Sequence, residues 1–489
     1  MKKNRFNKLF LLIIFSSVFS FFVSCSDSDS INNPVENNNT VTVVLLHTND
    51  EHGWMSSASN YNGAAGLMGL WKTNENYSAT GNFLVLSGGD NWTGPAISTW
   101  FQGESMVEVM NAMNYTASAI GNHEFDFKVD ELKQRITEAD FPYLSANIRY
   151  KGTNNIPEFI EPYLIKTISG ITFGIIGLTT TSTPTSAFPE NVEDFDFISY
   201  QQALNQFVPE MKSKGAEFII ADGHICVNEM QALVTTAKNL GISILTGGHC
   251  HEQHSSVSNG IVMIESGASM RGYSKVEIKY DTLKNAVVSL TPNFVNNTGT
   301  NIDASVKSIV DKWQQKTDDA LSEVIGYASQ EIPQSSNAMY NMIADSWLYS
   351  FPNSQISISN KGGVRQSLQA GEITLETIVG ILPFENEIIE LELTGSQVIN
   401  SLNSSLFTGG ITRVGGYYLS DGSAINSSAT YSVLITDFMY QSYNYFAGYD
   451  STPYYTNSNF RQPIIDWIKS LNTSPTNPLN NYLDTTSRE

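Results

Sequence analysis

Cysteine, cations and histidine are all scarce in this sequence, and each scarcity excludes something. Only three cysteines occur in 489 residues, so the fold is not a scaffold held together by disulfides. Lysine and arginine total 27 against 48 aspartate and glutamate residues, a formal net charge of −21 that would repel a nucleic-acid duplex. The seven histidines all precede residue 255. Histidines scattered over a surface would not respect that limit, so we expect most of them to share one site.

The remaining composition is that of a globular protein. Hydrophobic residues make up 41% of the chain and aromatic residues 11%, which excludes a disordered chain. The length suits two or three domains. The acidic balance is compatible with bound cations, although a solvated surface is its commonest meaning.

The first 24 residues have the pattern of an export signal. Four cations precede an apolar segment, Leu9–Val23, which is too short to span a bilayer comfortably as a helix. Ser24 and Cys25 follow and resemble a bacterial lipobox. We therefore expect a lipid on Cys25 that holds the protein in the cell envelope, facing the periplasm or the cell surface. The alternative is cleavage by an ordinary signal peptidase beside an incidental cysteine. Residues 25–40, rich in Ser, Asp and Asn, are predicted to be a flexible tether.

Five apolar runs, each predicted to be a buried strand, end in residues that can bind metals. One of these runs, Thr116–Ile120, is followed by Gly121-Asn122-His123-Glu124-Phe125-Asp126. Open α/β sheets bind ligands at the carboxyl ends of their strands, so such side chains should meet there. A single Asn-His pair would as readily be a polar turn. Four further segments repeat the arrangement, however: Val41–Gly53, Phe83–Asn91, Phe218–His224 and Ile242–His251.

The candidate ligands combine carboxylate, amide and imidazole groups. They are Asp50, His52, Asp90, Asn122, His224, His249 and His251. A mixed oxygen and nitrogen set suits zinc, manganese or iron better than calcium. The set is too large for one tetrahedral centre, so we expect two divalent metal ions that share one carboxylate. His47 and His254 fit the pattern less well, and we interpret them as structural or supporting residues.

Cys226 and Cys250 each lie one or two residues from a candidate histidine ligand. A disulfide between them is one interpretation for an exported protein. We favour the other, in which they are free thiols that fill space beside the metals.

Together the motifs DxH, GGDN, GNHEFD, a strand-ending His and GGHxH resemble a known family. It comprises the 5′-nucleotidases and UDP-sugar hydrolases among the calcineurin-like metallophosphoesterases, here in a bacterial lipoprotein form. The resemblance runs from about Val41 to the end of the chain. It implies an α/β (α+β) fold, in which a four-layer αββα sandwich of two mixed sheets precedes a smaller α+β domain.

The resemblance also assigns roles to the candidate residues. One metal would be held by Asp50, His52, Asp90 and His251, and the other by Asp90, Asn122, His224 and His249. A water that bridges two such cations loses a proton near neutral pH and would attack phosphorus. His123 would be the catalytic imidazole, oriented by Asp126. The alternative for that pair is a helix-capping aspartate beside a buried histidine.

A second domain is predicted after a boundary at Asn293–Thr300. Asp303 can cap a helix in which four apolar residues share one face: Val306, Ile309, Val310 and Trp313. We therefore predict a catalytic domain over 41–297, a linker helix within 298–325 and a substrate-binding domain over 326–489.

In the second domain, the resemblance implies that Asn360, Arg365 and Phe438 bind substrate. Arg365 would bind the phosphate, whose oxygen pair suits a guanidinium, and Phe438 would stack on a base. Because of two departures from the family pattern, the sequence does not identify the leaving group of the substrate. Ile411 stands where a second stacking phenylalanine is expected, and Ser442-Tyr443-Asn444-Tyr445 replaces a GGDG turn.

The sequence thus predicts an exported, metal-dependent phosphoric monoester hydrolase of 5′-nucleotidase type that acts on nucleotides. One alternative is the same centre acting on UDP-sugars, cyclic nucleotides or sugar phosphates. Another is a surface lipoprotein that binds a nucleotide without useful turnover.

Overall fold

The computed structural model describes residues 39–489 apart from 59, 60 and 444. The predicted export signal and nearly all of the predicted tether lie outside the described residues, as does Asn444. By their contacts, residues Thr40–Glu489 form one unit.

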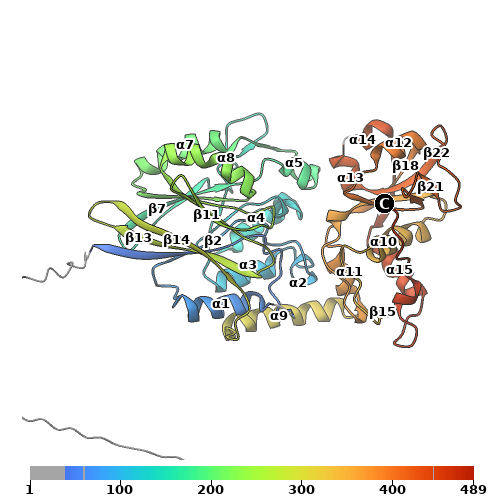
Figure 1. Cartoon of the computed structure of the whole chain (residues 1–489), viewed down its shortest axis with the longest axis horizontal. Coiled ribbons are helices and arrows are strands. Elements are labelled where there is room, and N and C mark those ends of the chain that lie inside the picture. Colours follow the sequence, from blue (N-terminus) through green and yellow to red (C-terminus); the bar gives the residue numbers. More distant parts are fainter. Residues whose placement is uncertain (1–38, 59–60, 444) are drawn as a thin grey trace, which may run out of the picture. The chain divides into compact units, whose positions relative to one another are not determined.

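Two six-stranded mixed sheets lie face to face in the first part of this unit (Figure 1). The order in the first sheet is β14 (Ala286–Asn296), β13 (Gly272–Asp281), β1 (Thr40–Thr48), β2 (Phe83–Ser87), β3 (Ala117–Ala119) and β4 (Tyr143–Leu144). The order in the second is β11 (Gln253–Ser258), β12 (Ile261–Ser266), β10 (Ile242–Thr246), β9 (Phe218–Gly223), β7 (Ile171–Leu178) and β6 (Tyr163–Ile168). An apolar layer that includes Leu45, Leu86, Phe173 and Ile220 fills the space between them. The central strands are covered on both faces, which explains their nearly continuous apolar sequences.

Helices cover the outer face of each sheet (Figure 1). On one side are α1 (Gly63–Asn74), α3 (Glu104–Ala112) and α4 (Lys128–Glu138), and on the other are α7 (Tyr200–Ser213) and α8 (Val227–Leu240). In α7 the Ser199 hydroxyl accepts the N–H of Gln202 as an N-cap, and Leu204, Phe207 and Met211 form the buried stripe. This four-layer αββα order confirms the predicted fold class.

The helix predicted after Asp303 is α9 (Ala304–Leu321). The Asp303 carboxylate accepts the N–H groups of Ser305 and Val306, as an N-cap does. Val306 and Trp313 are buried in the core of the first domain, where the Trp313 indole donates to Glu108 Oε2 at 2.8 Å. The helix therefore packs against the first domain before the chain enters the second.

The second domain is a smaller α+β domain around one five-stranded sheet. The strand order is β19 (Leu406–Gly409), β16 (Ile356–Asn360), β22 (Thr430–Thr436), β18 (Glu387–Thr394) and β23 (Tyr454–Asn459). One apolar cluster joins the sheet to α10 (Asn337–Ser350), α11 (Leu375–Ile381) and α15 (Gln462–Ser470). A second cluster joins it to α12 (Gly395–Ser401), α13 (Asp437–Ser442) and α14 (Tyr445–Tyr449).

No helix in the described part of the chain combines the length and the apolar character needed to cross a membrane.

Candidate active site

The candidate ligands lie just beyond the carboxyl ends of five strands, and these ends meet at one edge of the two sheets. Asp50 and His52 follow β1, Asp90 follows β2, and Asn122 follows β3. From the second sheet, His224 follows β9, and His249 and His251 follow β10. Because β1, β2 and β3 run parallel, as do β9 and β10, their ends point the same way.

Five of these residues have a left-handed backbone conformation that residues other than glycine rarely adopt. The φ angles are positive, between 45° and 75°, at Asp50, His52, Asp90, His249 and His251. Each such residue costs about 1–3 kcal/mol, a cost that persists where the surrounding structure fixes the chain for function. The strain indicates that the loops are shaped to aim these side chains.

The first group of ligands converges on the side chains of Asp50, His52 and His251. His251 Nε2 lies 3.2 Å from Asp50 Oδ1, and the Nε2 atoms of the two histidines are 3.3 Å apart. His52 Nδ1 donates to the carbonyl of Thr93 at 2.8 Å, which leaves the Nε2 lone pair facing the group. Such a hydrogen bond behind the ring is what orients an imidazole as a metal ligand.

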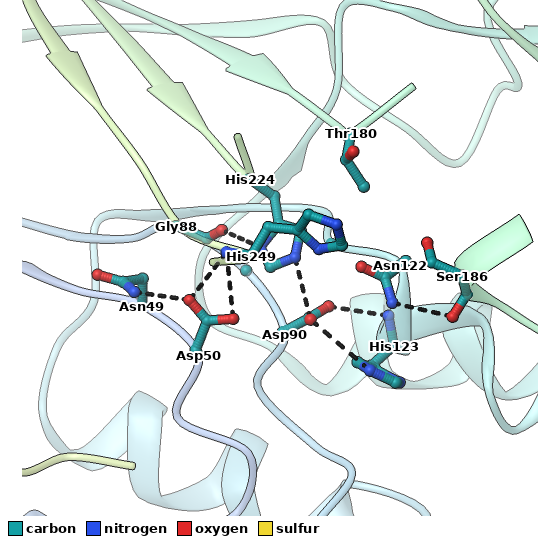
Figure 2. Close-up of polar contacts among 12 residues, drawn as sticks. Asn49, Asp50, Gly88, Asp90, Asn122, His123, Thr180, Ser186, His224 and His249 are labelled. Carbon is teal, nitrogen blue, oxygen red and sulfur yellow. Dashed lines mark hydrogen bonds and ion pairs between the residues drawn. The ribbon is translucent and has the colours of Figure 1, made fainter. Parts of the chain in front are cut away.

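The second group is centred on Asp90 and includes His224, His249 and Asn122 (Figure 2). His224 Nε2 lies 3.0 Å from Asp90 Oδ2, while His224 Nδ1 donates to the carbonyl of Gly88 at 2.8 Å. The amide of Asn122 donates to the carbonyl of Ser186 at 3.2 Å. Burial by itself raises the pKa of the Asp90 carboxyl, but His224 and His123 outweigh it and hold that pKa well below its usual range.

These residues fit a pair of metal ions. Three triads have ligand atoms within 4.8 Å of one another and could each hold an ion: Asp50, His52 and His251; His52, Asp90 and His123; Asp90, His224 and His249. The buried Oδ1 atom of Asn122 has no hydrogen-bond partner among the described residues. Buried polar atoms normally find one, so this oxygen is suited to ligation.

Two buried glutamates support the ligand loops, and sequence analysis missed both. Glu124 accepts the backbone N–H groups of Asp90, Asn91 and Gly121, at 2.9, 2.6 and 2.6 Å. Glu51 accepts the hydroxyl of Ser87 and the amide of Asn91. Glu51 lies within the DEH motif and Glu124 within the NHEFD motif. Their position beside candidate ligands was the only feature of the sequence that pointed to them.

Gly121 is required by the close approach of these loops. A side chain there would begin 2.1 Å from Asp90 Oδ1, which is closer than atoms can come. The glycine of the GNHEFD motif therefore lets the loops after β2 and β3 touch.

His123 and Asp126 form the pair expected from their spacing. Nδ1 of His123 lies 2.7 Å from Asp126 Oδ2, and its ring stacks on Phe384 with centroids 5.7 Å apart. Burial lowers the pKa of His123, but Asp126 and Asp90 outweigh burial and the net shift is upward. The pair thus favours the protonated imidazole over the neutral one.

Arg365 reaches the metal-binding side from the second domain. Its Nη2 atom lies 3.1 Å from His52 Nε2, and its guanidinium lies 5.9 Å from the centroid of the Phe384 ring. Burial lowers the pKa of Arg365, and the carboxylates of Asp90, Asp126 and Asp50 act in the opposite direction.

A cavity of about 420 Å³ opens beside His123 and Arg365. The first domain lines it with residues that include Asp126, Lys128, Phe188 and Glu190, and the second with Asn360, Phe384, Glu385, Asp437 and Phe438. A second cavity, of about 1030 Å³, is lined by His52, His251, Arg365, Trp54, Tyr61 and Arg271. Arg365 borders both.

Ile411 does not occupy the place that sequence analysis gave it. Its side chain is buried in the apolar core of the second domain, where 2% of it is exposed. Phe384 and Phe188 line the cavity with Phe438 instead. Phe188 belongs to the first domain, so no alignment within the second domain could have found it. Asn444, the other departure, lies outside the described residues.

The preference for free thiols was wrong, because Cys226 and Cys250 form a disulfide. Asp222 of β9 lies opposite Thr246 of β10 in a parallel pair. Each cysteine is four residues beyond one of these, so the two chains bring them together, with Cα atoms 5.2 Å apart. The disulfide thereby ties the loops that carry His224 and His249.

The two remaining histidines lie outside the ligand groups. His47 is fully buried, its Nδ1 is 2.9 Å from Ser266 Oγ, and burial lowers its pKa to about 3. It is therefore a neutral core residue. His254 is half-buried on β11, with Nε2 2.7 Å from the hydroxyl of Ser256.

Fold and site define a calcineurin-like phosphoesterase domain joined to a second, smaller α+β domain. The family model for calcineurin-like phosphoesterases matches residues 43–253, and that for the 5′-nucleotidase C-terminal domain matches residues 316–448. The chain belongs to the 5′-nucleotidase family of calcineurin-like phosphoesterases. That family consists of metal-dependent hydrolases.

Named relatives and a solved structure are similar to this chain. A human 5′-nucleotidase is 28% identical over 436 residues, which are 77% of this chain and 75% of that protein. An endonuclease of Bacillus subtilis is 24% identical over 401 residues, 73% of this chain but only 33% of that longer protein. The fold is also that of the 5′-nucleotidase precursor from Thermus thermophilus, with a TM-score of 0.78, 20% identity and coverage of 92% of this chain and 99% of that one.

Proposed function

We propose that the protein is a two-metal phosphohydrolase that removes phosphate from nucleotides, as a 5′-nucleotidase does. One observation carries the proposal: the His123–Asp126 pair and Arg365 line one cavity together with aromatic rings, and His123 and Arg365 also contact the candidate ligands Asp90 and His52. Phosphate, a leaving group and a flat base would each find a suitable partner there.

In this proposal, Asp50, His52, Asp90 and His251 would hold one divalent ion, and Asp90, Asn122, His224 and His249 the other. Such a pair supplies Lewis-acid chemistry and water activation at neutral pH. Zinc, manganese and iron are the candidates that the mixed ligand set favours.

The protein's own side chains bind and orient the substrate and move a proton. Arg365 binds a phosphate oxygen through a charge-assisted hydrogen bond. His123, held by Asp126, donates its Nε2 proton to the departing oxygen as a general acid. Phe438 and Phe384 line the cavity where a base would stack.

A second candidate is hydrolysis of a UDP-sugar or cyclic nucleotide by the same centre. The observation that favours it is the second cavity, which borders His52 and Arg365 away from His123. It leaves room for a substituent on the phosphate that a monoester lacks.

Hydrolysis of a panel of substrates, with the products separated by chromatography, tests both candidates, because cleavage of a UDP-sugar or a cyclic nucleotide yields monophosphates rather than free phosphate. The panel contains nucleoside 5′-monophosphates, UDP-glucose, cyclic nucleotides, sugar phosphates and p-nitrophenyl phosphate. We expect nucleoside monophosphates to be the best substrates, with activity lost to a chelator and restored by zinc or manganese. Faster turnover of UDP-glucose or a cyclic nucleotide would favour the second candidate. No hydrolysis of any substrate, with metals bound, would leave only the non-catalytic alternative.

We also propose export and a lipid anchor at Cys25, on the basis of the sequence pattern described above. Mass spectrometry of the mature protein tests this. A diacylglyceryl or acyl modification on an N-terminal Cys25 is expected, and Cys25→Ser should leave the protein in the soluble fraction. An unmodified mature terminus would contradict the anchor.

A further inference from the structure

One wall of the first cavity combines a carboxylate with an aromatic ring. Asp437 and Phe438 are adjacent at the start of α13, both are half-buried, and both line the cavity. Phe384 and Phe188 line it as well. A flat group stacked on such a ring presents its edge to neighbouring side chains.

The Asp437 carboxylate retains capacity to accept hydrogen bonds. It accepts the N–H of Phe438 at 2.7 Å and a backbone hydrogen bond from Glu387. An ionised carboxylate has about four acceptor sites and no donor. Among the described residues, no lysine or arginine pairs with it.

The groups packed against Asp437 are also acidic. Burial raises the pKa of Asp437 most, and the carboxylates of Glu387 and Glu190 raise it further, so that it reaches about 6. Glu190, on α6 (Pro189–Val192) of the first domain, accepts the amide of Gln441 of α13 at 2.9 Å. Asp437, Glu387 and Glu190 thus make this side of the cavity rich in hydrogen-bond acceptors. Among the described residues, none of these three carboxylates forms an ion pair. A ligand with hydrogen-bond donors suits this side of the cavity, and one with acceptors does not.

We infer that Asp437 is a specificity-determining residue, which selects nucleotides whose base carries an amino group by accepting a hydrogen bond from that group. The inference rests on the proposed function, since it names the substrate class of the same cavity. An amino group lies in the plane of the base and donates, whereas a carbonyl at the same position would face the carboxylate with a lone pair.

Three nucleotides that differ at one ring carbon provide the test: AMP, purine riboside 5′-monophosphate and IMP, of which IMP also carries a proton on the neighbouring ring nitrogen. They carry an amino group, a hydrogen and a carbonyl at the same ring carbon. We expect kcat/KM to be about tenfold or more higher for AMP than for purine riboside monophosphate, because the lost hydrogen bond is to a charged group. IMP should be poorer than AMP by at least as much.

Asp437→Asn should lower the ratio of the kcat/KM for AMP to that for purine riboside monophosphate to about threefold or less. The reason is that the neutral amide is a weaker hydrogen-bond acceptor than the carboxylate. The substitution should also improve IMP relative to AMP, since the amide can donate to the carbonyl. Asp319→Asn makes the same charge change on the exposed side of α9 and should keep the wild-type ratios. A misfolded variant would lose all three substrates together, so the ratios report on recognition.

The outcomes separate this inference from the proposed function. If no nucleoside monophosphate is hydrolysed, the proposed function fails. If all three are hydrolysed at similar kcat/KM, only the inference fails. An equal loss of AMP and purine riboside monophosphate activity in Asp437→Asn would assign the carboxylate to ribose hydroxyls or to folding, and would also overturn it.

Discussion

Asp90 is the residue on which both ligand groups depend, since its carboxylate lies 3.0 Å from His224 Nε2 and 3.9 Å from His52 Nε2. Asp90→Asn keeps the shape but removes the charge that offsets two cations. We expect it to lose both metals together and to abolish phosphate release. Metal content by mass spectrometry of the purified protein is the measurement. A variant with both metals and normal turnover would remove Asp90 from the shared position.

His123 has a different expected role, because its neighbour Asp126 occupies Nδ1. His123→Ala should keep both metals and lower turnover by roughly 10² to 10⁴, the usual contribution of a general acid or base. His254→Ala is the matched control, since that histidine lies away from the site on β11. Loss of metal in His123→Ala would mean that the roles of His123 and Asn122 are exchanged.

The selectivity attributed to Asp437 should depend on pH. Burial, with Glu387 and Glu190 nearby, raises its pKa to about 6, so the carboxyl is charged at pH 8 and largely neutral at pH 5. The preference for AMP over purine riboside monophosphate should therefore be full above the pKa and fall as pH drops through 6. Because metal ligands titrate as well, the measurement is the ratio of the two kcat/KM values, and a ratio constant from pH 5 to 8 would contradict the prediction.

At the scale of elements, the parallel pair β9 and β10 explains both the ligands and the disulfide. The loop after β9 carries His224 and Cys226, and the loop after β10 carries His249 and Cys250. Strands that end at the same edge bring both pairs together at once.

Reduction of the Cys226–Cys250 disulfide should weaken the fold around these loops. A loop closed over a sequence separation of 24 residues is worth about 3.5 kcal/mol in the chain-entropy account. We expect the double variant Cys226→Ser, Cys250→Ser to unfold at lower urea concentration and to bind metal more weakly. Dithiothreitol should shift the midpoint of the parent but not that of the variant. Equal midpoints would show that the disulfide contributes nothing to stability.

At the scale of the whole molecule, catalysis is proposed to need both domains, because Arg365 comes from the second and reaches His52 of the first. Arg365→Ala should lose about 1.5–3 kcal/mol of transition-state binding, the value of a hydrogen bond to a charged group. Lysine at that position should restore only part, since it cannot make the bidentate contact.

The control for this prediction separates phosphate binding from base binding. p-Nitrophenyl phosphate should lose as much activity as AMP in Arg365→Ala, whereas Phe438→Ala should affect nucleotides alone. Equal activity of Arg365→Ala and the parent on every substrate would mean that the first domain handles the phosphate by itself.

The sequence by itself determined the fold class and located the candidate ligands. Buried strands need apolar runs, and a ligand at a strand end sits shortly beyond the run: Asp50 lies two residues beyond β1, and His224 lies one residue beyond β9. Such information is local, so motif spacing carries it.

Only the tertiary structure decided which distant residues meet. The disulfide depends on the register of β9 against β10, and the cavity wall depends on Phe188 and Glu190 of one domain facing Phe438 of the other. Ile411 was misplaced for the same reason, because burial in a core is a property of packing and not of position in a motif. The left-handed conformations of five candidate ligands were likewise hidden, since close packing of the loops, rather than local preference, holds them there.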